Sequence, residues 1–133
     1  MIPEQNDKIG KLKIAFASKD GEYINEHFGW CEKFYIYEIH EDDSFFVDEI
    51  DSSLKFEDET DKLEYKISSL LDSDIVYVLQ IGPKASHMVK SAGIYPMKSS
   101  SDNGNEKIED VIRLLQKLIK NNPPLWLQRI LLK

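Results

Sequence analysis

Short apolar runs alternate with polar turns through the first part of the chain. Residues 12–18 (LKIAFAS) form one such run with turn-forming residues after it, which predicts a buried strand. Residues 34–40 (FYIYEIH) and 45–51 (FFVDEID) are typical of strands, and the four residues between them favour an antiparallel hairpin. A meander of three strands is therefore expected first.

The apolar spacing then changes to a helical period. The remaining expected elements are a helix whose apolar face holds Leu63, Ile67, Leu70 and Leu71, a strand at 75–81, a helix at 84–92 ended by Gly93, a strand at 94–97 and a helix at 108–119. The resulting order, β-β-β-α-β-α-β-α, predicts an α/β domain in which a mixed sheet carries helices on its faces.

The chain divides into three segments by composition. Residues 1–11 are polar and aperiodic, which predicts a flexible leader, whereas residues 12–120 hold the expected elements and form one domain. Asn121-Asn122-Pro123-Pro124 ends the last helix of that domain. We expect the apolar tail at 121–133 to pack on the domain or to be used for docking.

Charge and composition exclude several classes of partner. The net charge of -7 disfavours non-specific binding to nucleic acid or to an anionic membrane surface. No apolar run approaches the ~20 residues of a spanning helix, and no secretory signal is recognisable, so we expect a cytoplasmic protein. The single cysteine excludes an internal disulfide bond.

His27 and Cys31 are the first candidates for a binding site. They lie four residues apart in a loop, and an imidazole with a thiolate suits iron, zinc or copper. Two ligands do not close a tetrahedral zinc site, which disfavours structural zinc. A hydrogen-bonded loop histidine and a small buried cysteine remain the alternatives.

The turn at Gly82-Pro83 is the second candidate, because it begins a helix after the most apolar strand. A helix start presents free N–H groups and a positive dipole end, and Lys84 adds a full charge beside them. A routine β-to-α turn is the alternative, as is a surface position for the nearby His87. If the first strand and the 75–81 strand are parallel neighbours, both loops emerge at one edge of the sheet. The predicted site then consists of His27, Cys31, Gly82, Lys84 and His87, with His27 and Cys31 as metal ligands.

The sequence also resembles a known family in three ordered blocks, which together span residues 12–130. KIAFASKDGEYINEHFGWCEKFYIYEI resembles the opening of the nitrogenase iron–molybdenum cofactor biosynthesis family, the NifX/NafY group. VYVLQIGPKASHMVKSAGIYPMK is similar to the second block of that family, and NNPPLWLQRIL resembles the ending of its NifX members. The resemblance implies a ribonuclease-H-like three-layer α/β/α fold with a five-stranded mixed sheet of order 3-2-1-4-5.

The resemblance also implies a function without catalysis. Members of this family would bind an anionic iron–sulfur precursor of the iron–molybdenum cofactor, made by NifB, and pass it to the NifEN scaffold. By matching positions, His27 is the best candidate ligand and residues 81–87 form the second wall. Because the net charge is negative, we expect local donors to hold the anionic cluster, namely Lys19, Lys33, Lys84 and the backbone of residues 82–84. Two residues depart from the family pattern: Pro83 stands where a second glycine is common, and Cys31 where a small residue is common.

Two other functions compete with the carrier. A nuclease requires carboxylates on the central strands to hold metal ions, and the first strand has none. The stronger rival is an interaction module of nitrogenase assembly that binds no metal itself, with the apolar tail around Trp126 as its contact surface.

Overall fold

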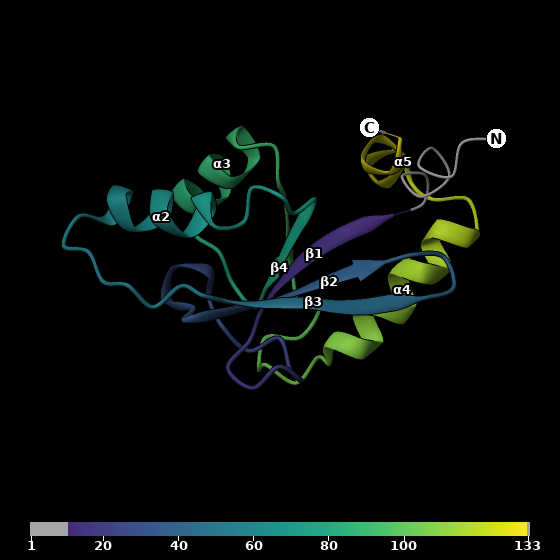
Figure 1. The fold of residues 1–133 in the computed structure, drawn as a ribbon, viewed down its shortest axis with the longest axis horizontal. Coiled ribbons are helices and arrows are strands. Elements are labelled where there is room, and N and C mark those ends of the chain that lie inside the picture. The colour runs from purple at the N-terminus through teal and green to yellow at the C-terminus, as the bar shows by residue number, and fades with distance from the viewer. Residues whose placement is uncertain (1–10, 133) are drawn as a thin grey trace.

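The computed structural model describes residues 11–132, which form one five-stranded sheet with helices on both faces (Figure 1). The strands are β1 (Leu12–Ala17), β2 (Lys33–Ile39), β3 (Ser44–Asp51), β4 (Ile75–Val78) and β5 (Tyr95–Lys98). Their order is β3-β2-β1-β4-β5, which confirms the predicted order. β1 pairs with β2, and β2 with β3, in antiparallel fashion, whereas β4 is parallel to both β1 and β5. The predicted hairpin and the predicted parallel neighbours are therefore both present.

The helices form the two outer layers. They are α2 (Glu59–Ser68), α3 (Pro83–Ser91), α4 (Ile108–Lys120) and α5 (Leu125–Leu131), and a short 3-10 turn, η1 (Phe28–Trp30), follows β1. Side chains alternate along β1, so Ala15 and Ala17 pack in the core beneath α2 and α3. Ile14 and Phe16 face the other way, into the core shared with α4 and α5. The sheet is thus buried on both faces.

The apolar tail folds as α5 and belongs to the second core. Leu127 is fully buried and Leu131 nearly so. The ring of Trp126 stacks on Tyr95, with ring centroids 4.7 Å apart and planes inclined by 7°. The predicted leader lies outside the described residues except for Lys11, whose ammonium pairs with Glu38 at 3.4 Å. None of the described helices is long and apolar enough to cross a bilayer.

The largest differences from the predicted helix and strand ends are at α2 and β4. α2 stops at Ser68, because the chain turns there with a hydrogen bond from the Leu70 N–H to the Ile67 carbonyl, and Leu71 is consequently 59% exposed. β4 ends at Val78 rather than at residue 81. Beyond Val78 the chain pairs with the loop that follows β1, and this pairing builds the candidate site.

Candidate functional site

The loops that follow β1 and β4 lie side by side at one edge of the sheet. The Phe28 N–H donates to the Gln80 carbonyl at 2.9 Å, and the Leu79 N–H donates to the Glu26 carbonyl at 3.0 Å. His27 and Gln80 form an isolated parallel bridge. Because backbone hydrogen bonds hold the two loops together, His27 and the start of α3 occupy one rim, as the parallel pairing predicts.

The first of these loops is organised by Asp20. Its carboxylate accepts the backbone N–H groups of Glu22 and Tyr23, both at 2.9 Å, and these bonds hold the pKa of Asp20 below its ordinary value. The Asn25 side chain accepts the Lys19 N–H at 2.8 Å and donates to Asp20. Side chains of the loop therefore form hydrogen bonds with its own backbone N–H groups. The loop places His27 at the rim in an exposed position.

A pocket of about 610 Å³ opens between the two loops and α2, and we call it the rim pocket. Its lining residues are His27, Gly29, Trp30, Glu59, Lys62, Leu63, Gln80, Ile81, Gly82, Pro83, Lys84 and Ala85. Three of the five predicted site residues, His27, Gly82 and Lys84, thus line one pocket. Lys62 and Gln80 were not predicted.

The start of α3 forms one wall of the rim pocket with uncapped backbone donors. Gly82 is the N-cap residue and has no side chain to occupy those donors. Pro83 carries no N–H, so the free donors of the first turn are those of Lys84 and Ala85. The positive end of the helix dipole therefore faces the pocket without a capping carboxylate.

Two lysine side chains add charge to the same pocket. The Lys84 ammonium donates to the Thr60 hydroxyl, which ties α3 to α2. The Lys62 ammonium pairs with Glu59 at 2.9 Å and lies 5.4 Å from the centre of the Trp30 ring. Two cations thus face one carboxylate, in a chain whose net charge is -7.

Cys31 differs from the prediction. It is fully buried among residues that include Phe28 and Phe34, and its thiol donates to the Lys33 carbonyl at 2.8 Å. Burial raises the pKa of the thiol to about 12. Because the thiolate is the form that binds metal, Cys31 does not offer a ligand to the rim pocket beside His27.

His87, Lys19 and Lys33 also lie away from the rim pocket. His87 lines a separate hollow between α2 and α3, together with Glu64 and Met88. Lys33 pairs with Glu49 across the β2–β3 hairpin at 3.3 Å. Among residues 11–132 no group of three or more histidine, cysteine or acidic side chains is placed to hold a metal ion. Of the predicted ligands, only His27 reaches the rim.

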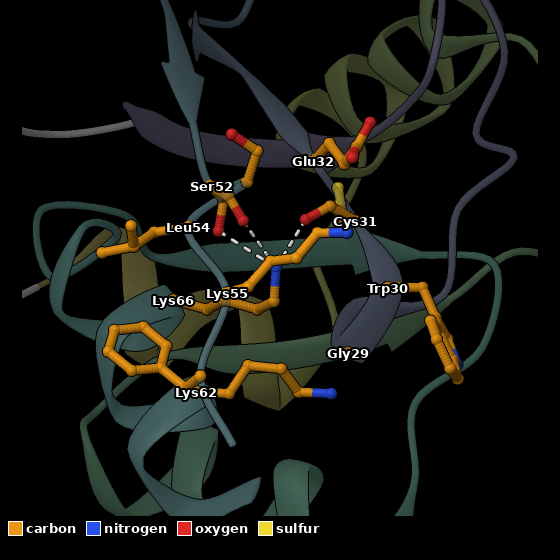
Figure 2. Close-up of a pocket in the computed structure, with 11 residues that line it drawn as sticks. Gly29, Trp30, Cys31, Glu32, Ser52, Leu54, Lys55, Lys62 and Lys66 are labelled. Atoms are coloured by element: carbon orange, nitrogen blue, oxygen red, sulfur yellow. Dashed lines mark hydrogen bonds between the residues drawn. The ribbon is translucent and has the colours of Figure 1, made fainter. Parts of the chain in front are cut away.

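A buried lysine supports the wall that carries Trp30. The Lys66 ammonium, from α2, donates to the Cys31 carbonyl at 2.5 Å and to the Ser52 carbonyl at 2.8 Å, and lies 3.3 Å from the Ser52 hydroxyl (Figure 2). Burial lowers the pKa of Lys66. These bonds join α2 to the end of η1 and to the segment after β3.

Comparison with known protein families gives a match over most of the chain. A family model described as dinitrogenase iron-molybdenum cofactor matches residues 10–118. The chain belongs to this family. Its relatives include the protein NifX of Herbaspirillum seropedicae, 31% identical over 92% of this chain and 83% of the relative. NifX of Azotobacter vinelandii is 31% identical over 96% of this chain and 80% of the relative. NifY of the same organism is 30% identical over 89% of this chain but only 47% of its own length.

Solved structures agree with the fold of this family member. The crystal structure of PH0822 superposes with a TM-score of 0.62 at 20% identity, covering 80% of this chain and 91% of the other. The protein mj0327 of Methanocaldococcus jannaschii gives a TM-score of 0.54 at 17% identity, over 80% of this chain and 89% of the other. At these identities the likeness establishes the architecture alone.

Proposed function

We propose that this chain is a non-catalytic carrier that binds an anionic iron–sulfur precursor of the nitrogenase iron–molybdenum cofactor. The observation that carries the proposal is the rim pocket, where an exposed imidazole and an uncapped helix start face the same space. Family membership and the relatives named NifX and NifY support a role in assembly of that cofactor.

The cargo would be held by one imidazole ligand and by several hydrogen-bond donors and cations that bind an anion. The His27 imidazole is a suitable ligand for an iron atom at the surface of the cluster. The N–H groups of Lys84 and Ala85 and the ammonium groups of Lys62 and Lys84 would stabilise its negative charge. A single protein ligand keeps the affinity modest, which suits a carrier that must release its cargo.

The remaining features of the proposal follow from the same family. The carrier would receive the precursor from NifB and deliver it to the NifEN scaffold in the cytoplasm, without chemical turnover. Neither nucleic acid nor a membrane is among its expected partners. The ribonuclease-H-like classification of the three-layer fold stays a prediction.

Anaerobic retention of the precursor tests the carrier directly. The protein is mixed with isolated precursor cluster and passed over a gel-filtration column, and iron and visible absorption are measured in the protein peak. We expect the wild type to retain iron and His27→Ala to lose most of it. His87→Ala is the matched control, because His87 lies outside the rim pocket. Equal retention by His27→Ala and the wild type would exclude this site.

The alternative function is an interaction module that binds no metal itself. It is favoured by two exposed leucines, Leu125 at the start of α5 and Leu132 just after its end. Co-expression with NifB distinguishes the two functions. A colourless protein that still captures an assembly partner supports the module, whereas a brown, iron-containing protein supports the carrier.

A further inference from the structure

A second pocket lies next to the rim pocket, on the other side of Trp30 and Lys62. It has a volume of about 280 Å³ and we call it the Lys66 pocket. Its lining residues are Gly29, Trp30, Cys31, Glu32, Ser52, Ser53, Leu54, Lys55, Phe56, Lys62 and Lys66 (Figure 2). The segment after β3, at residues 52–56, forms one wall and α2 forms the floor.

The floor of this pocket carries a positive charge that makes no direct ion pair with a carboxylate among residues 11–132. The Lys66 ammonium directs its hydrogen bonds to two backbone carbonyls and one hydroxyl, and it forms no ion pair within residues 11–132. Neutral acceptors satisfy its N–H groups, and the carboxylates of Glu26 and Glu32 attract its charge only from beyond ion-pair distance, so burial of the charge stays costly. An anion in the pocket would reduce that cost.

The other charged side chains that line the Lys66 pocket sum to a net positive charge. Lys55 lines the pocket and makes no ion pair with any described residue, and Lys62 shares its charge with Glu59. Glu32 is the only carboxylate in the lining, and it is exposed. Three lysines therefore oppose one acid in the lining of this pocket.

The walls of the same pocket are apolar and open to solvent. Trp30, Leu54 and Phe56 are 76%, 58% and 38% exposed, and all three line it. In Figure 2, Leu54 and Trp30 lie on opposite sides of Lys66. A ligand with an apolar portion would cover these surfaces, and that burial would add to the attraction of the lysines.

We propose that the Lys66 pocket binds a small organic anion, a carboxylate or a phosphate monoester that carries an apolar group. Its charged group would lie over Lys66 and between Lys55 and Lys62, and its apolar group would contact Trp30 and Leu54. The site adjoins the rim pocket and shares Gly29, Trp30 and Lys62 with it, but binding of an iron-free anion there can be tested apart from the cluster-carrier function.

Titration with model anions tests this site in the intact protein. The probes are phenyl phosphate and phenylacetate, with inorganic phosphate and benzyl alcohol as controls for the apolar group and the charge. Binding is followed by calorimetry and by fluorescence of Trp30, with Trp30→Phe identifying its signal against Trp126. We expect at least one phenyl anion to bind at least about tenfold more tightly than both controls. The stronger of the two phenyl probes identifies the preferred anion.

Variants assign the binding to the pocket. Lys66→Met should weaken the phenyl anion about tenfold, because it removes the fixed charge. If that variant does not fold, Lys55→Gln serves instead and should weaken binding about two- to fivefold. Lys117→Gln, an exposed position on α4, is the matched control and should bind as the wild type does. Gly82→Asp, which alters only the rim pocket, should also leave this binding unchanged.

Three outcomes overturn the proposal. They are no binding of either phenyl anion, equal binding of benzyl alcohol or inorganic phosphate, and undiminished binding in the folded lysine variants. Because the probes contain no iron, these results are independent of whether the rim pocket binds the cluster precursor.

Discussion

Replacing Gly82 with aspartate separates the stability of α3 from its capacity to bind an anion. Gly82 has φ -75° and ψ 164°, an extended conformation open to any residue. A Cβ atom added there would meet nothing within 4 Å. Aspartate is also a preferred N-cap residue, so Gly82→Asp should leave the fold intact and stabilise it by a few tenths to about 1 kcal/mol.

The same substitution should weaken the binding of an anionic cargo strongly. The new carboxylate would accept the free N–H groups of the first turn and place a negative charge in the rim pocket. Two like charges about 4 Å apart repel by about 4 kcal/mol at an effective dielectric constant of about 20. The rim is open to solvent and salt, so we expect about 1–3 kcal/mol, or roughly a 5- to 150-fold loss of affinity.

Two measurements on one preparation test this expectation. Thermal unfolding should give a midpoint equal to or above that of the wild type, and anaerobic titration with the precursor should give the weaker affinity. Gly82→Asn is the matched control, because it caps the helix without a charge and should lose less affinity than Gly82→Asp. Affinity equal to the wild type in a folded Gly82→Asp protein would refute the role of the α3 start.

Four further predictions concern the core and the loops. The Cys31 thiol should react with iodoacetamide at least about 1000-fold more slowly in the native protein than in urea, since its pKa rises from 9.0 to about 12. By the same shift, the wild type should lose stability between those pH values relative to Cys31→Ala in urea unfolding, because the unfolded chain releases the proton first. Leu127→Ala should destabilise the protein by about 2–5 kcal/mol in chemical denaturation if α5 is part of the core, whereas the exposed Leu125→Ala should change it by less than about 0.5 kcal/mol. Gly21→Ala should cost about 1–2 kcal/mol in the same assay, because Gly21 has φ +76° and its Cβ would lie 2.9 Å from the Tyr35 ring; a neutral result would contradict this reasoning.

The sheet could be predicted well from the sequence, because its signals are local. Alternating apolar runs mark the β2–β3 hairpin, and Gly93 ends α3 with φ +86°, as a glycine at that position predicts. The position of β1 beside β4 is different, because Ile14 pairs with Ile75 across some sixty residues. That pairing came from the family resemblance and from topology rules rather than from local pattern.

Cys31 and His87 lie outside the rim pocket because of the directions in which their side chains point. In a 3-10 turn, residues three apart point the same way, so Cys31 follows the buried Phe28 into the core while His27 remains outside. His87 lies two residues from Ala85 and two from Val89, both buried, which directs it to the opposite face of α3. Both side-chain directions could have been predicted if the position of the 3-10 turn and the phase of the helix had been known.

Lys66 was missed for a related reason. It stands three residues after Leu63 and next to Ile67, within the apolar stripe of α2. A charged residue in such a stripe is a sign of a buried polar contact. The acceptors that it requires come from residues 31 and 52, and no sequence pattern placed those residues near α2.

The backbone bonds between residues 26–28 and 79–80 bear on the order in which the protein folds during synthesis. The meander of β1, β2 and β3 can form while the rest of the chain is still within the ribosome, because its contacts are between neighbours in sequence. The loop that carries His27 acquires its fixed position only after β4 has been inserted beside β1. A nascent or truncated chain that ends before β4 would therefore lack the paired loops of the rim pocket, and under the proposed carrier function it could not bind the cluster precursor.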